Sequence, residues 1–300
     1  MTEDKPRCGF VAIVGAPNAG KSTLLNALVG AKVSIVTHKV QTTRMRVTGI
    51  RVVGAAQIVF VDTPGILAPR QRLERAMVQA AWAGARDADV VVLAIDAVRG
   101  LTDEVRSIVE GLNAARRTAV VALNKVDLVR RDTLLPLAAA IDATKIARRV
   151  FMVSALTGDG VGDLLGFLAG EVPEGPWLYP EDQLSGLPLR LLAAEITREK
   201  LFLRLHEELP YSLTVETESW TEHKDGGVRI DQIVYVAREN HRPIVLGAGG
   251  RTIKAVGSAA RAELEAFLGR RVHLFLHVKV QPGWTDDPER YRDLGLEFPR

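Results

Sequence analysis

Residues 15–22 have the types and spacing of a loop that binds phosphate. The segment reads Gly15-Ala16-Pro17-Asn18-Ala19-Gly20-Lys21-Ser22 and matches G-x-x-x-x-G-K-[ST]. It lies between an apolar run, Phe10–Val14, and a segment of helical spacing, Gly20–Val29. Glycines allow backbone amides to face phosphate oxygens, and a helix amino terminus adds partial positive charge. We expect this loop, with Thr23, to bind the nucleotide, Lys21 to contact the β- and γ-phosphates and Ser22 to ligate Mg²⁺.

A second group of residues with candidate chemistry follows the apolar run Ile58–Val61. It reads Asp62-Thr63-Pro64-Gly65. A carboxylate that ends a strand lies at the ligand-binding edge of a parallel sheet. We therefore predict that Asp62 holds Mg²⁺ and that the Gly65 amide binds the γ-phosphate, which gives Gly65 a catalytic role. By itself this tetrapeptide is also a common turn.

Base recognition is indicated by two further segments, each at the end of an apolar run. Asn124-Lys125-Val126-Asp127 follows Val120–Leu123, and Ser154-Ala155 follows Phe151–Val153. An aspartate at position 127 can accept hydrogen bonds from N1–H and the 2-amino group of guanine, and adenine has neither donor. We expect the Ala155 amide to donate to guanine O6. These residues predict GTP rather than ATP and disfavour an ATP-dependent P-loop kinase.

Gln41-Thr42-Thr43-Arg44 lies between the phosphate loop's helix and the next strand-like run. A threonine in this position can ligate Mg²⁺ only while the γ-phosphate is present, which provides an order–disorder switch. The sequence does not distinguish Thr42 from Thr43, so we keep both as candidate catalytic residues and Mg²⁺ ligands. The ordinary alternative is a polar surface loop.

The elements that must position these residues alternate between strands and helices. Apolar runs without breaks alternate with helix-like segments near 72–86, 103–115, 133–147 and 161–169. Buried parallel strands have this unbroken apolar character. We predict an α/β domain with a doubly wound, mostly parallel sheet over residues 1–172. The proline-rich residues 173–188 read as a linker.

Residues 189–300 have a different order of elements. A helix near 189–208 precedes strand-like runs at 212–219 and 229–237, a glycine cluster, a helix to about Phe267 and a last strand from Val272 to Val280. This order predicts a small α+β domain. Its glycine cluster reads Gly247-Ala248-Gly249-Gly250, followed by Arg251-Thr252-Ile253-Lys254.

The glycine cluster resembles the G-x-x-G loop of a type II KH domain, which clamps about four single-stranded nucleotides. Residues 181–300 hold 17 Lys and Arg against 19 Asp and Glu, so the domain is slightly acidic. Residues 238–261, however, contain one acidic residue, Glu239, and five Lys and Arg residues: Arg238, Arg242, Arg251, Lys254 and Arg261. A local positive field suits a small single-strand site. We predict RNA contacts from Arg242, Gly247, Ala248, Gly249, Gly250, Arg251 and Lys254.

Composition excludes several other classes of protein. The 300-residue chain is 47% hydrophobic and 25% charged, with a net charge of +3, which are globular values. Its one cysteine, Cys8, cannot form an internal disulfide, which fits a reducing compartment. The amino terminus has no apolar run of the signal-peptide kind, and the run near Val90–Ile95 is far shorter than the ~20 residues that span a bilayer. We expect a cytoplasmic protein.

Together the nucleotide motifs resemble the translation-factor-related class of P-loop GTPases. Their fusion to a KH-like domain resembles the Era family of bacterial ribosome-assembly GTPases over nearly the whole chain, including Val278-Lys279-Val280 and Trp284. The resemblance implies hydrolysis of GTP to GDP with Mg²⁺, a KH domain that binds the 3′ end of 16S rRNA, and a role in 30S subunit assembly. It also implies peripheral contact with the inner membrane, for which the sequence offers no anchor. We expect a monomer.

Catalysis is expected to be slow. Ile66 follows Gly65, where Ras-like GTPases have a glutamine that orients water, and isoleucine has no group that can do so. Asn18 resembles the asparagine with which potassium-stimulated GTPases hold a monovalent cation, so K⁺ is a candidate cofactor. Two readings remain: a GTPase that times RNA binding, and a binding module in which the nucleotide only stabilises the fold. A tandem-domain relative is disfavoured because one P-loop is present.

Overall fold

A computed structural model of the chain describes residues 5–39, 42–69, 71–206 and 209–299. The chain divides into two compact units. The first comprises Met1–Gly186 and Tyr291–Arg300, and the second comprises Leu187–Arg290. Gln41 of the predicted switch segment, and the predicted helical residues 207 and 208, lie outside the described residues.

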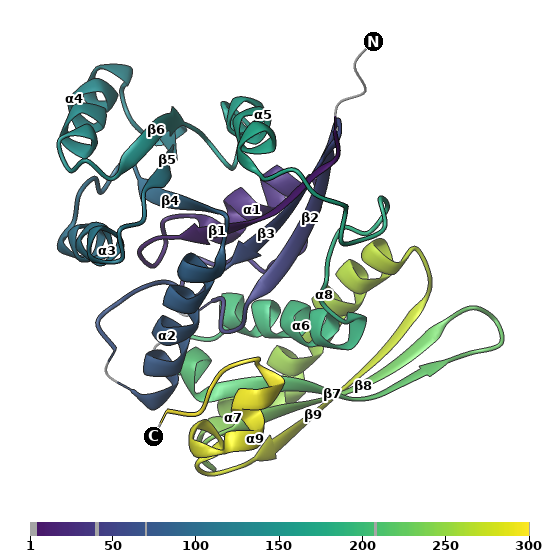
Figure 1. The fold of residues 1–300 in the computed structure, drawn as a ribbon. Helices are drawn as coiled ribbons and strands as arrows, with labels where there is room; N and C mark the ends of the chain where they lie inside the picture. Colours follow the sequence, from purple (N-terminus) through teal and green to yellow (C-terminus); the bar gives the residue numbers. More distant parts are fainter. Residues whose placement is uncertain (1–4, 40–41, 70, 207–208, 300) are drawn as a thin grey trace. The chain divides into compact units, whose positions relative to one another are not determined.

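The first unit is built on a six-stranded sheet with the order β2-β3-β1-β4-β5-β6 (Figure 1). Its strands are β1 (Arg7–Val14), β2 (Val47–Val53), β3 (Ala56–Asp62), β4 (Val90–Asp96), β5 (Ala119–Asn124) and β6 (Ala147–Met152). β2 pairs antiparallel with β3, and the other neighbours are parallel. Every residue of β3, β4 and β5 is buried, as expected for strands with both faces covered. The predicted doubly wound α/β fold is confirmed.

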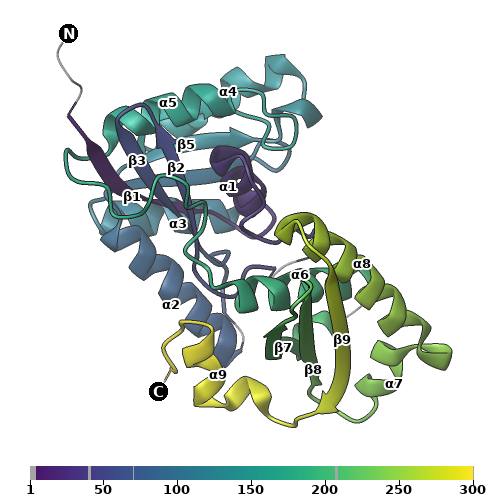
Figure 2. The ribbon, with the colours of Figure 1, turned by 90° about the vertical axis from the view of Figure 1, so that its right-hand side faces the viewer.

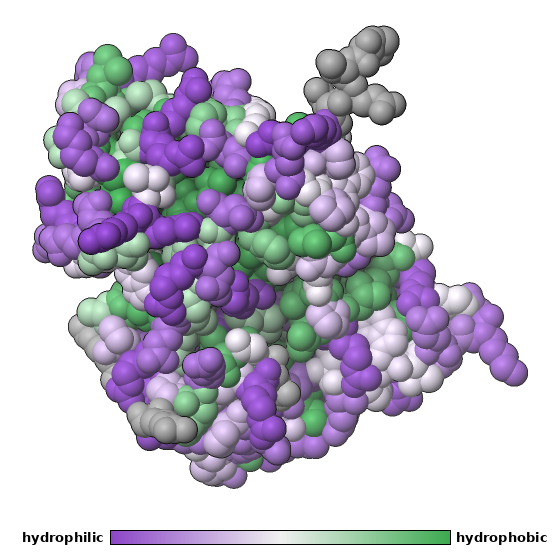
Figure 3. All heavy atoms as spheres, viewed as in Figure 1, coloured by the Kyte–Doolittle hydropathy of each residue, from purple (hydrophilic) through white to green (hydrophobic). Residues whose placement is uncertain are grey.

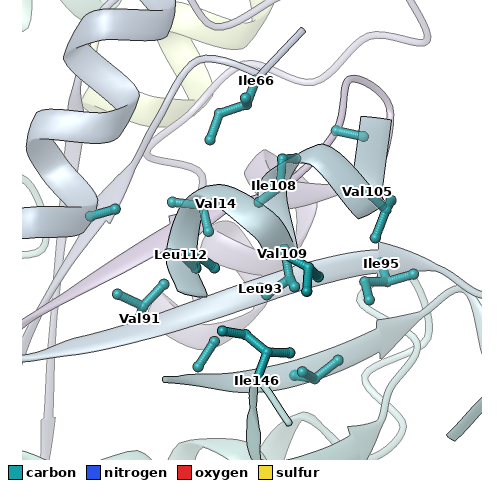
Figure 4. Close-up of a cluster of buried hydrophobic side chains, with 14 of the residues drawn as sticks. Val14, Ile66, Val91, Leu93, Ile95, Val105, Ile108, Val109, Leu112 and Ile146 are labelled. Atoms are coloured by element: carbon teal, nitrogen blue, oxygen red, sulfur yellow. The ribbon is translucent and has the colours of Figure 1, made fainter. Parts of the chain in front are cut away.

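Helices cover both faces of this sheet (Figure 1). They are α1 (Lys21–Val29), α2 (Arg72–Asp87), α3 (Asp103–Ala114), α4 (Arg131–Asp142) and α5 (Val161–Glu171). Side chains of α2, α3 and α4 join the sheet in a buried apolar cluster, part of which is drawn in Figure 4. The helices α1 and α5 contact each other and β3 on the other face. Because the sheet is held on both faces, the loops at its carboxyl edge start from fixed positions.

Two elements of this unit differ from the prediction. Strand β2 was not expected, because Gly49 and Arg51 interrupt its apolar run and it is an edge strand with exposed positions. The helix predicted over 133–147 is wrong beyond Asp142, since α4 ends there and β6 begins at Ala147. Between them Lys145 has φ 60°, a left-handed conformation that a continuing helix does not contain.

The predicted linker contacts three strands of the first unit's sheet, β1, β2 and β3. Residues 174 and 185 form isolated bridges with Arg7 and Gly49. The buried Gln57 side chain accepts from the backbone amides of Leu178 and Tyr179. These bridges and hydrogen bonds pair part of the linker backbone with the first unit, although the prolines prevent a helix or strand.

The second unit is an α+β domain with a three-stranded sheet of order β7-β8-β9. Its elements are α6 (Leu189–Arg204), β7 (Leu213–Glu222), β8 (Val228–Val236), α7 (His241–Leu246), α8 (Arg251–Leu268) and β9 (Val272–Val280). β8 pairs antiparallel with β7 and parallel with β9. Helices α6 and α8 contact each other and pack on the sheet (Figure 2). The short α7 was not predicted, because its six residues include Pro243 and lack a long helical pattern.

The carboxyl-terminal segment follows a helix, α9 (Pro288–Asp293). Although we predicted a domain over 189–300, the last ten residues group with the first unit. There the Tyr291 and Phe298 rings lie 4.9 Å apart, and the Arg72 guanidinium lies 5.1 Å from the Phe298 ring centre. The cation over the Phe298 ring therefore connects this segment to α2 of the first unit, and the Tyr291–Phe298 pair is a contact within the segment.

The β7–β8 hairpin closes through the exposed residues His223–Gly226, and its tip is hydrophilic in Figure 3. Among the described residues, no helix combines the length and apolarity needed to cross a membrane.

Candidate functional site

The phosphate loop connects β1 to α1, as its spacing predicted. Gly20 caps α1 with φ 86°, a conformation that favours glycine. A Cβ at this position would collide with the Asn124 side-chain amide. Gly20 is thus required both by the backbone turn and by the close approach of the Asn124 side chain.

Lys21 is the first residue of α1, and its side chain is buried. Its ammonium group donates to the carbonyl oxygens of Gly15 and Ala16 at 3.2 and 3.0 Å. Burial lowers the pKa of Lys21 to about 8, against the opposing attraction of the Asp62 carboxylate. A desolvated cation held inside the loop is poised to bind an anion, because a bound phosphate would compensate for its lost hydration.

Asp62 ends β3 and is fully buried at the same edge of the sheet. Its Oδ2 accepts from the hydroxyls of Ser22 at 2.6 Å, Ser34 at 3.0 Å and Thr43 at 3.3 Å. Burial raises the pKa of this carboxyl group, and Lys21 and the three hydroxyls oppose the rise.

The atoms around Asp62 fit a hard divalent cation. Its Oδ1 is buried and has no hydrogen-bond partner among the described residues. Ser22 and Thr43 place their hydroxyl oxygens 2.9 Å apart beside the same carboxylate. Oxygen atoms of this kind, completed by phosphate oxygens and water, are the ligands that Mg²⁺ prefers.

The hydroxyl groups of Thr42 and Thr43, between which the sequence did not distinguish, have different partners in the structure. Thr43 is buried, and its hydroxyl joins Ser22 and Asp62. Thr42 directs its hydroxyl into its own loop, where it donates to the Lys39 carbonyl at 2.6 Å and lies 2.6 Å from the Thr37 hydroxyl. Thr43 is therefore the better candidate for a metal ligand.

Gly65 and Ile66 approach the phosphate loop after β3. An added Cβ on Gly65 would lie 3.1–3.2 Å from backbone atoms of Pro17. The Ile66 amide donates to the Gly15 carbonyl at 3.2 Å. Its side chain is buried in the apolar cluster beside Val14 and Ile108 (Figure 4). Ile66 is thus a packing residue, with neither the polarity nor the exposure to orient an attacking water.

Asn124 connects the loops predicted to recognise the base to the phosphate loop. Its Nδ2 donates to the Ala19 carbonyl at 3.0 Å, and its Oδ1 accepts from the amides of Lys125 at 2.9 Å and Ala155 at 3.0 Å. The Ala155 amide, which we expected to face guanine O6, is therefore bonded within the protein. If it contacts the base, its N–H would be shared between Asn124 Oδ1 and guanine O6.

Lys125 reaches across the same edge of the sheet. Its ammonium donates to the Asn18 carbonyl at 2.7 Å and to the Asp96 carboxylate at 2.6 Å. Asp96 ends β4 and was not identified from the sequence, because a single aspartate after an apolar run has no distinguishing pattern. Its position at the carboxyl end of a parallel strand was the available signal.

The other residues predicted to recognise the base lie on adjacent loops. Asp127 is exposed in the short helix η1 (Val126–Leu128). The Ser154 hydroxyl accepts from the Thr157 amide at 3.2 Å and is buried. Leu156, which follows Ala155, is 80% exposed.

A cavity of about 470 Å³ joins the phosphate loop to the switch segment. Its lining includes Asn18, Lys21, Ser22, Thr43, Gly65 and Lys125. Asp127, Ser154 and Ala155 lie outside this lining, on the loops tied to it through Asn124. The cavity thus collects the groups expected to bind phosphate and metal, with base recognition to one side.

The glycine cluster of the second unit forms a tight connection between α7 and α8. Gly249 is exposed with φ 61°, and a Cβ built on it would meet open space. Arg242, Arg251 and Lys254 are exposed around the loop. The backbone amides at the start of α8 and these cations can therefore reach a phosphate chain. Ile244, 55% exposed on the unpredicted α7, adds an apolar contact surface.

Fold and site together define a P-loop GTPase joined to a KH domain. Family models agree: residues 10–125 match the family described as 50S ribosome-binding GTPase, and residues 208–285 match the KH domain.

Similar full-length proteins identify the family. The chain is 60% identical to GTPase Era of Dinoroseobacter shibae, covering 99% of this chain and 98% of the relative. It is 62% identical to GTPase Era of Mesorhizobium japonicum, covering 97% and 94%. This chain belongs to the GTPase Era family, and it is a GTPase.

Two crystal structures of Era share the whole architecture at 40% identity. One is an Aquifex aeolicus Era variant bound to GDP·AlF4⁻, with a TM-score of 0.91 over 96% of this chain and 99% of that one. The other is Era in complex with MgGDPNP and nucleotides 1506–1542 of 16S ribosomal RNA, with a TM-score of 0.92 over 97% and 99%.

Proposed function

We propose that this GTPase binds the 3′ end of 16S rRNA through its KH domain when GTP is bound, and that it thereby assists assembly of the 30S subunit. The observation that carries the RNA part is the open Gly247–Gly250 loop with Arg242, Arg251 and Lys254 exposed around it. The related Era complex with 16S nucleotides and MgGDPNP supports the choice of RNA.

For the nucleotide site we propose that Ser22, Thr43 and Asp62 hold Mg²⁺. When bound, Mg²⁺ would neutralise charge on the β- and γ-phosphates. Lys21 would donate to the same phosphates, and the Gly65 amide would bind the γ-phosphate. Asp127 would accept from the guanine edge. Since Thr43 belongs to a loop, its ligation would connect the conformation of residues 42–44 to the presence of the γ-phosphate.

Potassium is a candidate accelerator of hydrolysis in this protein. Asn18 lines the nucleotide cavity, and Ile66 offers no polar group to the attacking water. A monovalent cation at Asn18 would add positive charge beside the phosphates. We expect faster steady-state GTP hydrolysis in potassium buffer than in sodium buffer of the same ionic strength. Equal rates would remove K⁺ from the proposal.

The nucleotide-gated function is tested by RNA affinity in two nucleotide states. We expect the protein to bind a 16S 3′-end oligonucleotide about tenfold more tightly with a GTP analogue than with GDP, within the ordinary range of allosteric coupling. Fluorescence anisotropy with a labelled oligonucleotide measures both affinities. Equal affinities would favour the alternative, a binding module whose nucleotide does not control RNA.

The glycine loop itself is tested by Gly249→Asp in the same assay. Aspartate tolerates the left-handed conformation, and open space surrounds the position, so the domain should fold. The added charge should repel RNA phosphates and weaken binding tenfold or more, with basal GTP hydrolysis unchanged. Gly249→Asn has the same shape without the charge and is the matched control. It should bind RNA more tightly than Gly249→Asp does. Normal RNA binding by Gly249→Asp would refute the phosphate clamp.

Assembly of the 30S subunit, a cytoplasmic location, peripheral contact with the inner membrane and a monomeric state stay predictions from the family resemblance.

A further inference from the structure

Ser34 is a buried hydroxyl residue next to the candidate metal site that the sequence motifs do not include. It is 2% exposed. Its hydroxyl donates to Asp62 Oδ2 at 3.0 Å. Its backbone is tied to α1, because the amide donates to Asn26 Oδ1 at 2.9 Å and the carbonyl accepts from Asn26 Nδ2 at 2.8 Å. The neighbouring Val33 amide donates to the same Asn26 oxygen at 2.9 Å.

Asn26 therefore fixes Ser34 from a helix and not from the switch loop. Asn26 lies in the same helix as Lys21 and Ser22, so the distance from Ser34 to the phosphate loop is set by regular structure. Thr43 follows a separate part of the chain, beyond residues 40 and 41. The Ser34 hydroxyl can keep its place whether or not Thr43 is engaged.

The hydrogen bonds on Asp62 are distributed unequally between its two oxygens. Oδ2 accepts from three hydroxyls, whereas Oδ1 has no hydrogen-bond partner among the described residues. Three hydrogen bonds on one oxygen restrict rotation of the carboxylate, which leaves Oδ1 as an acceptor for a metal ion or a metal-bound water. Two of the three donors, Ser22 and Thr43, are themselves candidate metal ligands, so their geometry depends on metal and nucleotide.

We propose that Ser34 is a positioning residue for the magnesium carboxylate, with Asn26 as its support. Its hydroxyl keeps the orientation of Asp62 constant through the nucleotide cycle. The assignment rests on the Mg²⁺ site proposed above and is independent of RNA binding. Partners of this kind, one step removed from the metal, commonly change metal affinity 10- to 100-fold when removed.

The test is the Mg²⁺ affinity of the full-length protein carrying a fluorescent GDP analogue. Mg²⁺ is titrated against the rate of nucleotide release, and the midpoint reports metal binding. We expect Ser34→Ala to need about tenfold more Mg²⁺ at the midpoint. Its nucleotide affinity at saturating Mg²⁺ should stay close to that of the wild type. Loss of hydrolysis at low Mg²⁺ should be recovered by adding Mg²⁺.

Val33→Ala is the matched control, because Val33 is equally buried and adjacent but has no hydroxyl. It should lower the melting temperature and leave the Mg²⁺ midpoint unchanged. An unchanged midpoint in Ser34→Ala, or an equal shift in Val33→Ala, would overturn the positioning role. If Ser34→Ala does not fold, Ser34→Cys takes its place, because cysteine has a similar shape and is a weaker hydrogen-bond donor. A Mg²⁺ midpoint between those of the wild type and a tenfold shift would support the positioning role, and an unchanged midpoint would overturn it. If the rate of nucleotide release from the wild-type protein does not change with Mg²⁺ concentration, the proposed metal site itself is refuted.

Discussion

Replacing Lys21 with alanine should abolish tight GTP binding. The Lys21 ammonium is buried within the phosphate loop, and removing one partner of a buried, hydrogen-bonded charge pair costs about 3 kcal/mol or more. This corresponds to a loss of affinity of about 100-fold or more. Titration with a fluorescent GTP analogue in saturating Mg²⁺ measures the loss directly.

Lys254→Ala provides the control for this experiment. Lys254 is an exposed lysine on α8 of the second unit, so its removal should weaken RNA binding and leave GTP affinity unchanged. Lys21→Ala should lose GTP affinity and keep the wild-type affinity for RNA when RNA binding is measured without nucleotide. Retention of the wild-type GTP affinity by Lys21→Ala would contradict the assignment of residues 15–22 as the phosphate site.

Asp127→Asn should exchange guanine for xanthine as the preferred base. The carboxylate accepts from two guanine donors, and hydrogen bonds to charged groups contribute about 1.5–3 kcal/mol. We therefore expect GTP affinity to fall by about 10- to 150-fold. Affinity for XTP should rise, because the amide can donate to the 2-oxo group of xanthine. Competition of GTP and XTP against a fluorescent nucleotide measures the preference.

The exposed position of Asp127 makes this substitution informative, since a change there should not disturb the core. Asp132→Asn is the matched control: Asp132 is a nearby exposed aspartate that pairs with Arg130 on the surface. It should leave both affinities at the wild-type level. An Asp127→Asn protein that still prefers GTP by the original margin would refute the base-recognition role.

Much of the fold and of the nucleotide site was predictable because both depend on short segments. Gly15–Ser22 and Asn124–Asp127 each follow a buried strand, and the carboxyl ends of parallel strands meet at one edge of a sheet. Their convergence therefore follows from local pattern plus chain topology. Strand β2 was missed because an edge strand lacks the continuous apolar run of its buried neighbours.

The sequence by itself determined the two domain types, and it predicted their chemistry: a phosphate loop, a guanine-selecting aspartate and a glycine clamp for RNA. These are set by residue type and spacing along a few residues. The tertiary structure alone placed the Thr43 hydroxyl, and not that of Thr42, beside Asp62, and it paired Lys125 with Asp96. It also brought Ser34 to Asp62 and fixed the Ser34 backbone through Asn26. Such contacts join residues that are far apart in the chain, and their partners depend on which way each side chain points once the strands and helices have packed.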